Sequence, residues 1–307
     1  MRQADSNQTE SLLGISWEDE LPFGRILNLT TDTIQRINLT NYQLSYRITE
    51  PANRICLGYR PGTGNPEEHS TCTKIPEKGR KCEPCTRKDQ IFAAGLHHAH
   101  TRDRGSLSAE ILNHLEQPNY LYVAIFGDGS IKVGTSTARR IGTRLLEQGA
   151  FLASIICETS NGFMVRTLED MITKDLGLVQ AISTKRKMKG VLHPLSQTEL
   201  RETLNNVCGK VTDFLENLAL EGYSMILDNW YNPAIESPCW KKVLKYPKNL
   251  SNGTHDLTLV SICGRIGVLR RETEAEFYAA DLDELFGIIV EVGQFPPEDF
   301  TIQGELF

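Results

Sequence analysis

Short apolar stretches separated by turn residues predict an α+β protein. Residues 120–126 and 131–134 are rich in β-branched and aromatic side chains, and Gly127-Asp128-Gly129-Ser130 lies between them. Because an Asp-Gly pair favours the positive φ angles of a tight reversal, this stretch predicts a β-hairpin. The apolar run at 151–159 is expected to form a third strand beside the hairpin.

Helical spacing follows the hairpin and returns twice along the chain. Ile141, Leu145 and Leu146 fall on one face of a predicted helix. A second helix is expected from about 164 to 176. Ser196 and Glu199 have the spacing of a capping box, so a third helix is expected to start there and to run to about residue 220.

Both ends of the chain are predicted to be rich in β-strands. Residues 43–48 and 54–59 alternate in polarity around a reversal at 51–53, and glycine turns divide 257–292 into four short strands that could pair with the N-terminal ones. We therefore divide the chain into a mobile lead-in (1–20), a β segment with a Cys-rich loop (21–105), a core (106–222), and a connector with a small β domain (223–307).

Composition indicates a soluble globular protein, with 40% hydrophobic and 23% charged residues. No run of eighteen apolar residues is present and the first residues lack the apolar core of a signal peptide, so we expect a cytoplasmic protein without a membrane partner. The net charge is −6, but residues 271–307 hold ten acidic and one basic side chain. The rest of the chain is slightly basic, and a local basic surface could still bind phosphate.

Four of the eight cysteines lie within thirty residues of one another: Cys56, Cys72, Cys82 and Cys85. The spacing of Cys82 and Cys85 lets both thiolates reach one tetrahedral ion. We interpret the four cysteines as a structural zinc site, with His69 as the substitute ligand. A redox pair formed by Cys82 and Cys85 is the competing interpretation.

Histidines and a run of cations follow, and each is open to two interpretations. His98 and His100 could form a second metal site or supply a base near the active centre, or they could lie in a solvated loop. Residues 185–190 hold four cations, which belong either to a solvated loop or to a basic surface that holds a phosphate backbone without reading bases. The candidate residues for binding nucleic acid are Arg139, Arg140, Lys185, Arg186 and Lys187.

The hairpin and the helix after it resemble the GIY-YIG nuclease superfamily. Tyr120-Leu121-Tyr122 falls on the GIY motif and Lys132-Val133-Gly134 on the YIG motif. Arg144 falls on the arginine of the following helix, and Glu169 on the metal-binding glutamate. The resemblance implies a GIY-YIG-like small antiparallel sheet with flanking helices, preceded here by the zinc-binding β segment and followed by the small β-rich C-terminal domain.

The resemblance also implies roles for these side chains. In the nucleases, the tyrosine of GIY helps to activate water, the arginine neutralises phosphate charge and the glutamate holds one divalent cation. Tyr122, Arg144 and Glu169 are the candidates here, with Mg²⁺ or Mn²⁺ as the cation. The sequence departs from the pattern at Tyr120, Lys132 and Gln148, and the Lys132 ammonium can supply positive charge but cannot act as a base.

Residues from about 46 to 292, and FGDGSIKVGTS…RLLEQGA in particular, also resemble an uncharacterised family of bacterial proteins of unknown function. Three functions therefore remain open. The first is metal-dependent phosphodiester hydrolysis on nucleic acid, with Lys132 assisting the three candidates above. The second is a non-catalytic, zinc-stabilised module that binds nucleic acid or a protein, which the Lys132 and Gln148 replacements favour. The third is an enzyme that acts on a small molecule in the same pocket.

Overall fold

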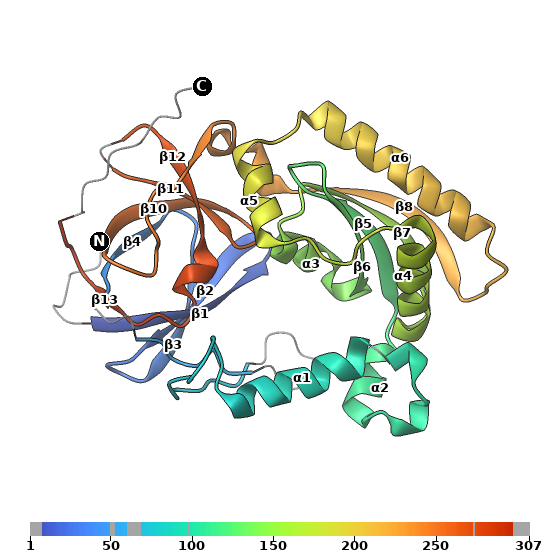
Figure 1. The fold of residues 1–307 in the computed structure, drawn as a ribbon, viewed down its shortest axis with the longest axis horizontal. Helices are drawn as coiled ribbons and strands as arrows, with labels where there is room; N and C mark the ends of the chain where they lie inside the picture. Colours follow the sequence, from blue (N-terminus) through green and yellow to red (C-terminus); the bar gives the residue numbers. More distant parts are fainter. Residues whose placement is uncertain (1–7, 50–52, 60–68, 98, 273, 297–307) are drawn as a thin grey trace. The chain divides into compact units, whose positions relative to one another are not determined.

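A computed structural model of the chain confirms the α+β class (Figure 1). The structure describes residues 8–49, 53–59, 69–97, 99–272 and 274–296. The chain divides into two compact units. The first comprises Met1–Leu57, Cys72–Cys82 and Glu236–Phe307, and the second comprises Gly58–Thr71 and Glu83–Ile235.

The second unit is built on a four-stranded antiparallel sheet in the order β6-β5-β7-β8. Its strands are β5 (Asn119–Ile125), β6 (Ile131–Thr137), β7 (Leu152–Thr159) and β8 (Tyr223–Tyr231). The expected hairpin joins β5 to β6, and the expected third strand, β7, pairs with β5. In the turn, Gly129 has a φ of +79° and its N–H donates to the carbonyl of Phe126 over 2.8 Å.

Six α-helices lie in the described part of the second unit: α1 (Glu83–His97), α2 (Ala109–Leu115), α3 (Ile141–Gln148), α4 (Gly162–Leu176), α5 (Thr184–Leu192) and α6 (Gln197–Glu216). Helices α4 and α6 flank the sheet, α4 against β5, β6 and β7, and α6 against β5 and β7 (Figure 1). The capping box expected at Ser196 and Glu199 begins α6. Within the described residues, no helix is long and apolar enough to cross a bilayer.

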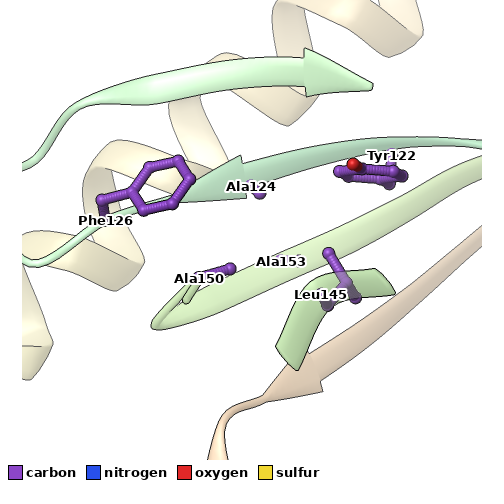
Figure 2. Packing of buried hydrophobic residues seen from close by; sticks show 6 residues of the cluster. All are labelled: Tyr122, Ala124, Phe126, Leu145, Ala150 and Ala153. Carbon is purple, nitrogen blue, oxygen red and sulfur yellow. The ribbon is translucent and has the colours of Figure 1, made fainter. Parts of the chain in front are cut away.

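Strand β5 forms the centre of this unit's core. All its residues except Tyr120 are buried, because β5 lies between two other strands and beneath the helices. Tyr122, Ala124 and Phe126 follow one another on one face, where they pack with Leu145 of α3 and with Ala150 and Ala153 (Figure 2). The side chain of Tyr122 is completely buried.

The first unit is built on a nine-stranded sheet in the order β3-β2-β1-β13-β4-β10-β11-β12-β9. Its strands are β1 (Gln8–Glu18), β2 (Leu21–Asn28), β3 (Thr33–Asn38), β4 (Tyr42–Arg47), β9 (Val243–Lys245), β10 (Thr254–Cys263), β11 (Ile266–Arg270), β12 (Phe277–Asp281) and β13 (Val290–Val292). Strands from the two ends of the chain pair directly, because β4 lies between β13 and β10. The N-terminal and C-terminal β regions are therefore parts of one sheet.

Two segments expected to lack regular structure form strands. The lead-in expected at residues 1–20 contains β1, which pairs with β2 and β13 and buries Leu13 and Trp17. The connector expected from residue 223 begins with β8, which completes the core sheet. The chain passes from one unit to the other at 57–58, 71–72, 82–83 and 235–236, whereas the sequence pattern predicted boundaries at 105 and 222.

Two other segments have a secondary structure that differs from the predicted one. The cationic run 185–190 lies in helix α5 rather than in a loop, and Ser183 caps that helix by accepting the N–H of Arg186. The strand expected at 54–59 is absent from the described residues, where Arg54 and Tyr59 form only isolated bridges. The backbone there pairs with the cysteine-rich loop instead, since the N–H of Cys56 donates to the carbonyl of Lys74 over 2.8 Å. The reversal at 51–53 lies partly outside the described residues.

Candidate functional site

Tyr122 and Gly134 face each other across the hairpin and fix the position of the tyrosine ring. They are paired in the register of β5 and β6, so their side-chain positions share one face of the sheet. A Cβ atom at Gly134 would lie 2.5 Å from the hydroxyl oxygen of Tyr122. Only glycine therefore leaves room for the phenol to lie across β6.

Lys132 lies on the same face, two residue pairs along the hairpin. It is paired with Ala124, and its Nζ atom lies 5.7 Å from the centroid of the Tyr122 ring. Only 6% of Lys132 is exposed. Burial lowers the pKa of Lys132 to about 8, Arg144 acts in the same direction, and Glu169 opposes the change.

Two helices bring an arginine and a carboxylate to this face. Arg144 of α3 and Glu169 of α4 both act electrostatically on Tyr122 and on Lys132. Glu169 is buried and accepts a hydrogen bond from Arg166, one turn earlier on α4, over 2.8 Å. The side chains of Arg144 and Arg166 are 43% and 27% exposed, so both lie nearer the solvent than the groups they accompany.

The hydroxyl of Tyr122 is buried and makes no hydrogen bond within the described residues. The side chains of Arg144 and Gln148 approach it and lower its pKa, but burial outweighs them and raises the pKa of Tyr122 above its usual value. The Oε1 atom of Gln148 is likewise buried without a partner among the described residues. Two polar groups at one place thus retain unused hydrogen-bonding capacity.

The five predicted nucleic-acid-binding residues differ in the contacts that their side chains make. Arg139 and Lys185 are exposed, whereas Arg140 pairs with Glu147 over 2.9 Å and Arg186 pairs with Asp128 over 3.3 Å. Lys187 donates to the carbonyl of Gln148 over 2.7 Å, and its charge also acts on Lys132. Helix α5 therefore contributes a cation to the face that carries Tyr122.

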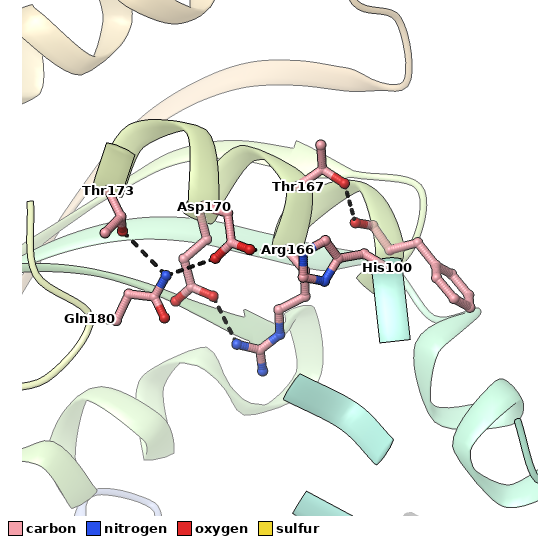
Figure 3. Close-up of polar contacts among 8 residues, drawn as sticks. His100, Arg166, Thr167, Asp170, Thr173 and Gln180 are labelled. Atoms are coloured by element: carbon pink, nitrogen blue, oxygen red, sulfur yellow. Dashed lines mark hydrogen bonds and ion pairs between the residues drawn. The ribbon is translucent and has the colours of Figure 1, made fainter. Parts of the chain in front are cut away.

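His100 does not ligate a metal with other residues, but joins a hydrogen-bonded chain on α4. Its Nε2 atom lies 2.8 Å from Asp170, which also accepts from Gln180 over 2.9 Å (Figure 3). Thr173 extends the chain beyond Gln180. The second metal site considered for His98 and His100 has no support in the described residues, since His98 lies outside them and His100 joins no group of metal-binding side chains.

The four predicted cysteines lie together. One ligand atom each from Cys56, Cys72, Cys82 and Cys85 lies within 4.8 Å of all the others, so this set could hold a metal ion. The Sγ atom of Cys82 lies 3.6 Å from that of Cys56 and 3.8 Å from that of Cys72. His69 is not a member of the set.

Local structure places partial positive charge near the sulfurs of Cys56, Cys82 and Cys85. Cys82 and Cys85 lie at the start of α1, where the helix dipole stabilises a thiolate. The backbone N–H of Cys82 also donates to the Sγ atom of Cys56 over 3.2 Å. Such bonds stabilise negative charge on sulfur, as metal coordination requires.

Residues 46–249 match the family described as "Protein of unknown function (DUF2797)". The chain belongs to this family. The matched residues include the four cysteines, Tyr122, Lys132, Arg144 and Glu169. No curated protein and no solved structure matches the chain.

Among the described residues, Arg166 is the one charged residue at the Tyr122 face that the sequence analysis did not name. Arg166 precedes Glu169 by three residues on α4, and that helical spacing could have indicated the ion pair. Lys187 was expected on a nucleic-acid-binding surface, but its position beside Lys132 depends on how α5 packs, which periodicity does not give. We call Lys132, Arg144, Arg166 and Lys187, with Glu169 and Tyr122, the basic cluster.

Proposed function

We propose that the basic cluster hydrolyses phosphodiester bonds in nucleic acid. One observation carries the proposal: Tyr122, Lys132, Arg144 and Glu169 come from four elements and act on one another at a single place. The same four positions are those that the resemblance to the GIY-YIG nucleases assigns to the reaction. The substrate would be the phosphate backbone, which the cations attract without regard to sequence.

Each side chain has a role that its surroundings permit. Arg144 and Lys132 would stabilise the charge that develops on the phosphate in the transition state. The Tyr122 hydroxyl would orient the attacking water by a hydrogen bond. It would not remove the proton at neutral pH, because burial raises its pKa. The lowered pKa of Lys132 leaves a minor fraction of neutral amine at pH 7, which is larger than that of an exposed lysine, and this fraction could accept a proton as a weak base.

Glu169 is the residue that would hold Mg²⁺ or Mn²⁺. Magnesium in such sites takes one or two carboxylates and completes its shell with water and substrate phosphate, so a single glutamate fits this requirement. The Oε2 atom of Glu169 bonds Arg166, which leaves Oε1 for the cation. When bound, the cation supplies Lewis-acid polarisation of the phosphate.

The cysteine set is proposed to be a structural zinc site. Four sulfurs placed about 2.3 Å from a central zinc ion in a tetrahedron lie roughly 3.8 Å apart. The two separations of 3.6 and 3.8 Å are close to that value. Four protein ligands leave no open position, so the ion would stabilise the fold and not react.

The second candidate function is a non-catalytic, zinc-stabilised binding module. The Glu169–Arg166 pair favours it, because a carboxylate already bound by a guanidinium attracts a cation less strongly. A protein partner or a small-molecule substrate remains a weaker alternative, with no specific contact in its favour.

Incubation with supercoiled DNA and with structured RNA tests the proposal. We expect cleavage that requires Mg²⁺ or Mn²⁺ and that Glu169→Gln abolishes. Asp175→Asn, an exposed acid on the same helix, is the matched control and should cleave normally. Salt-sensitive binding without cleavage would favour the binding module. If the protein neither binds nor cleaves nucleic acid, both nucleic-acid functions are excluded.

A further inference from the structure

The basic cluster contains more positive charge than its own carboxylate can balance. Lys132 is buried among three other cations (Arg144, Arg166 and Lys187), and the only carboxylate that acts on it to an appreciable extent is Glu169. Arg144 pairs with Glu147 over 3.9 Å and Arg166 pairs with Glu169 over 2.8 Å, whereas the buried Lys132 forms no salt bridge within the described residues. Buried charge without a counter-ion costs stability, so an arrangement of this kind is suited to an anion.

A second observation points to a ligand at the same place. The Tyr122 hydroxyl and the Gln148 Oε1 atom are both buried and lack hydrogen-bond partners within the described residues. An oxygen of a bound anion could accept from the hydroxyl, and after a half-turn of the amide it could accept from the Gln148 nitrogen as well. Unpartnered polar groups and uncompensated charge therefore coincide.

Exposure limits how an anion can enter. Tyr122, Lys132 and Glu169 are 0%, 6% and 3% exposed, whereas the side chains of Arg166 and Arg144 are 27% and 43% exposed. The arginines thus lie at the outer side and the lysine with the phenol at the inner side. A phosphate in the interior of a polynucleotide carries two chain substituents, and both would have to be accommodated beside the two arginines. A terminal phosphate carries only one.

We propose that the basic cluster binds a terminal phosphate group, with Lys132 and the Tyr122 hydroxyl as its innermost contacts and Arg144 and Arg166 at the rim. Charge agrees with geometry, because a phosphodiester carries one negative charge and a phosphomonoester nearly two at neutral pH. The inference rests on the proposed function only in that it uses the same site, and it adds a terminal phosphate, at a chain end or on a small molecule, as a ligand of that site.

Binding is expected to protonate Lys132. Burial lowers the pKa of Lys132 to about 8, so part of the population is neutral near that pH, and a dianion beside the amine favours its charged form. The groups that face Lys132 are Tyr122 on β5, Arg144 on α3, Arg166 and Glu169 on α4, and Lys187 on α5. Proton uptake on binding at pH 8 would therefore indicate that the amine of Lys132 becomes charged.

Calorimetric titration of the full chain, without divalent cations, tests the proposal. The probes are inorganic phosphate and dimethyl phosphate, a diester of similar size. We expect inorganic phosphate to bind at least about tenfold more tightly, as one additional charge-assisted hydrogen bond would give. We expect Lys132→Met to remove about tenfold or more of that affinity, and Lys210→Met, an exposed lysine on α6, to remove none.

A measurement on the unaltered protein keeps the test valid if Lys132→Met misfolds. Titrations at pH 8 in two buffers of different ionisation enthalpy should show net proton uptake when inorganic phosphate binds. Equal affinity for phosphate and dimethyl phosphate would overturn the proposal, and so would full affinity in a folded Lys132→Met variant. Absence of proton uptake would overturn the assignment of Lys132 as an inner contact.

Short single-stranded oligonucleotides with a phosphate at the 5′ end, at the 3′ end, or at neither distinguish the source of the phosphate. Preference for a phosphorylated end would assign the site to nucleic-acid termini. Equal weak binding of all three, with tight binding of inorganic phosphate, would assign it to small phosphomonoesters. Phosphate binding without nuclease activity would leave this inference intact and contradict the hydrolase, whereas cleavage without preference for the dianion would do the reverse.

Discussion

The cysteine set and the basic cluster follow the same electrostatic rule with opposite signs. The cysteine set gathers four sulfurs that become anions when they lose their protons, and it is suited to a cation. The basic cluster gathers four cations around one carboxylate, and it is suited to an anion. In both places the groups would repel one another if all of them carried their charge at once. The excess charge of each site therefore indicates the charge of the ligand that the site is suited to bind.

The two sites differ in how they can avoid that repulsion. Every cysteine can remain a neutral thiol, so the cysteine set without an ion is merely unconstrained. In the basic cluster Lys132 can lose its charge, because burial lowers its pKa to about 8, whereas arginine stays protonated. Lys132 is buried, and its lowered pKa reflects both that burial and the repulsion of the neighbouring cations. The cysteine set should thus depend on its ion for folding, and the basic cluster should fold without a ligand at some cost in stability.

Loss of the metal is expected to have the largest effect. Structural zinc contributes on the order of 10 kcal/mol of binding free energy in small zinc domains. We expect Cys82→Ala to lose about one zinc ion per chain and to lower the melting temperature by roughly 10 °C or more. Elemental analysis and thermal unfolding measure the two effects.

The matched control is Cys208→Ala, a buried cysteine on α6 outside the set. It should keep its metal and melt within a few degrees of the parent. If the parent protein contains no zinc, and thiol counting shows Cys82 and Cys85 to be oxidised, the redox pair replaces the zinc site and the comparison with the basic cluster fails.

Replacement of Lys132 by methionine should have the next largest effect, and it should be stabilising. Because the folded-state pKa of about 8 lies below the unfolded value of 10.5, folding disfavours the protonated lysine. The penalty is fully present below pH 8 and disappears as the pH rises toward 10.5. We expect Lys132→Met to raise the free energy of unfolding by about 3 kcal/mol at pH 7 and by about 1 kcal/mol at pH 10.

Urea unfolding at the two pH values measures this gain. Lys210→Met, which removes an exposed lysine, should change the free energy of unfolding by less than about 0.5 kcal/mol at either pH. A gain for Lys132→Met that does not shrink between pH 7 and pH 10 would show that lost charge is not its cause.

The two sites could be predicted to different extents, because the cysteine set consists of residues close in sequence and the basic cluster depends on how separate elements pack. Cys56, Cys72, Cys82 and Cys85 lie within thirty residues and share a rare chemistry, so composition and spacing were enough to group them. Tyr122, Lys132 and Arg144 could be aligned with a known motif. Arg166 and Lys187 could not, because their positions depend on the packing of α4 and α5 against the hairpin.

The fold shows the same division. The hairpin, β7, α4 and the start of α6 were predicted, because each has strong local signals such as the Asp-Gly turn and the Ser196 capping box. The segment of strand β8 was interpreted as the start of a connector, since the composition shifts toward Pro, Asn and Trp from residue 223 onward. Its strand structure comes from pairing with β7, which is not encoded locally.

A substitution at Gly134 tests whether the basic cluster depends on the space that glycine leaves in β6 as well as on charge. The Cβ of Gly134→Ala would lie 2.5 Å from the Tyr122 hydroxyl oxygen and 2.6 Å from the adjacent ring carbon. We expect a loss of about 1–3 kcal/mol in the free energy of unfolding, the usual cost of overpacking a core. Gly142→Ala on α3 meets no atom within 4 Å and should instead be neutral or stabilising by about 0.5–1 kcal/mol. Equal effects of the two substitutions would contradict the placement of the ring across β6.

The smallest effect is expected for a cation that already has a partner at the surface. Arg186 is 61% exposed and pairs with Asp128 over 3.3 Å, so its charge is both hydrated and balanced. We expect Arg186→Gln to lower the free energy of unfolding by no more than about 1 kcal/mol, and less at 0.5 M salt, because salt screens exposed ion pairs. Lys132→Met should retain most of its stabilising effect at the same salt concentration, since a buried charge is screened far less. If urea unfolding shows that salt abolishes both effects equally, then Lys132 is solvated like Arg186, and the distinction between a balanced surface cation and a buried surplus does not hold.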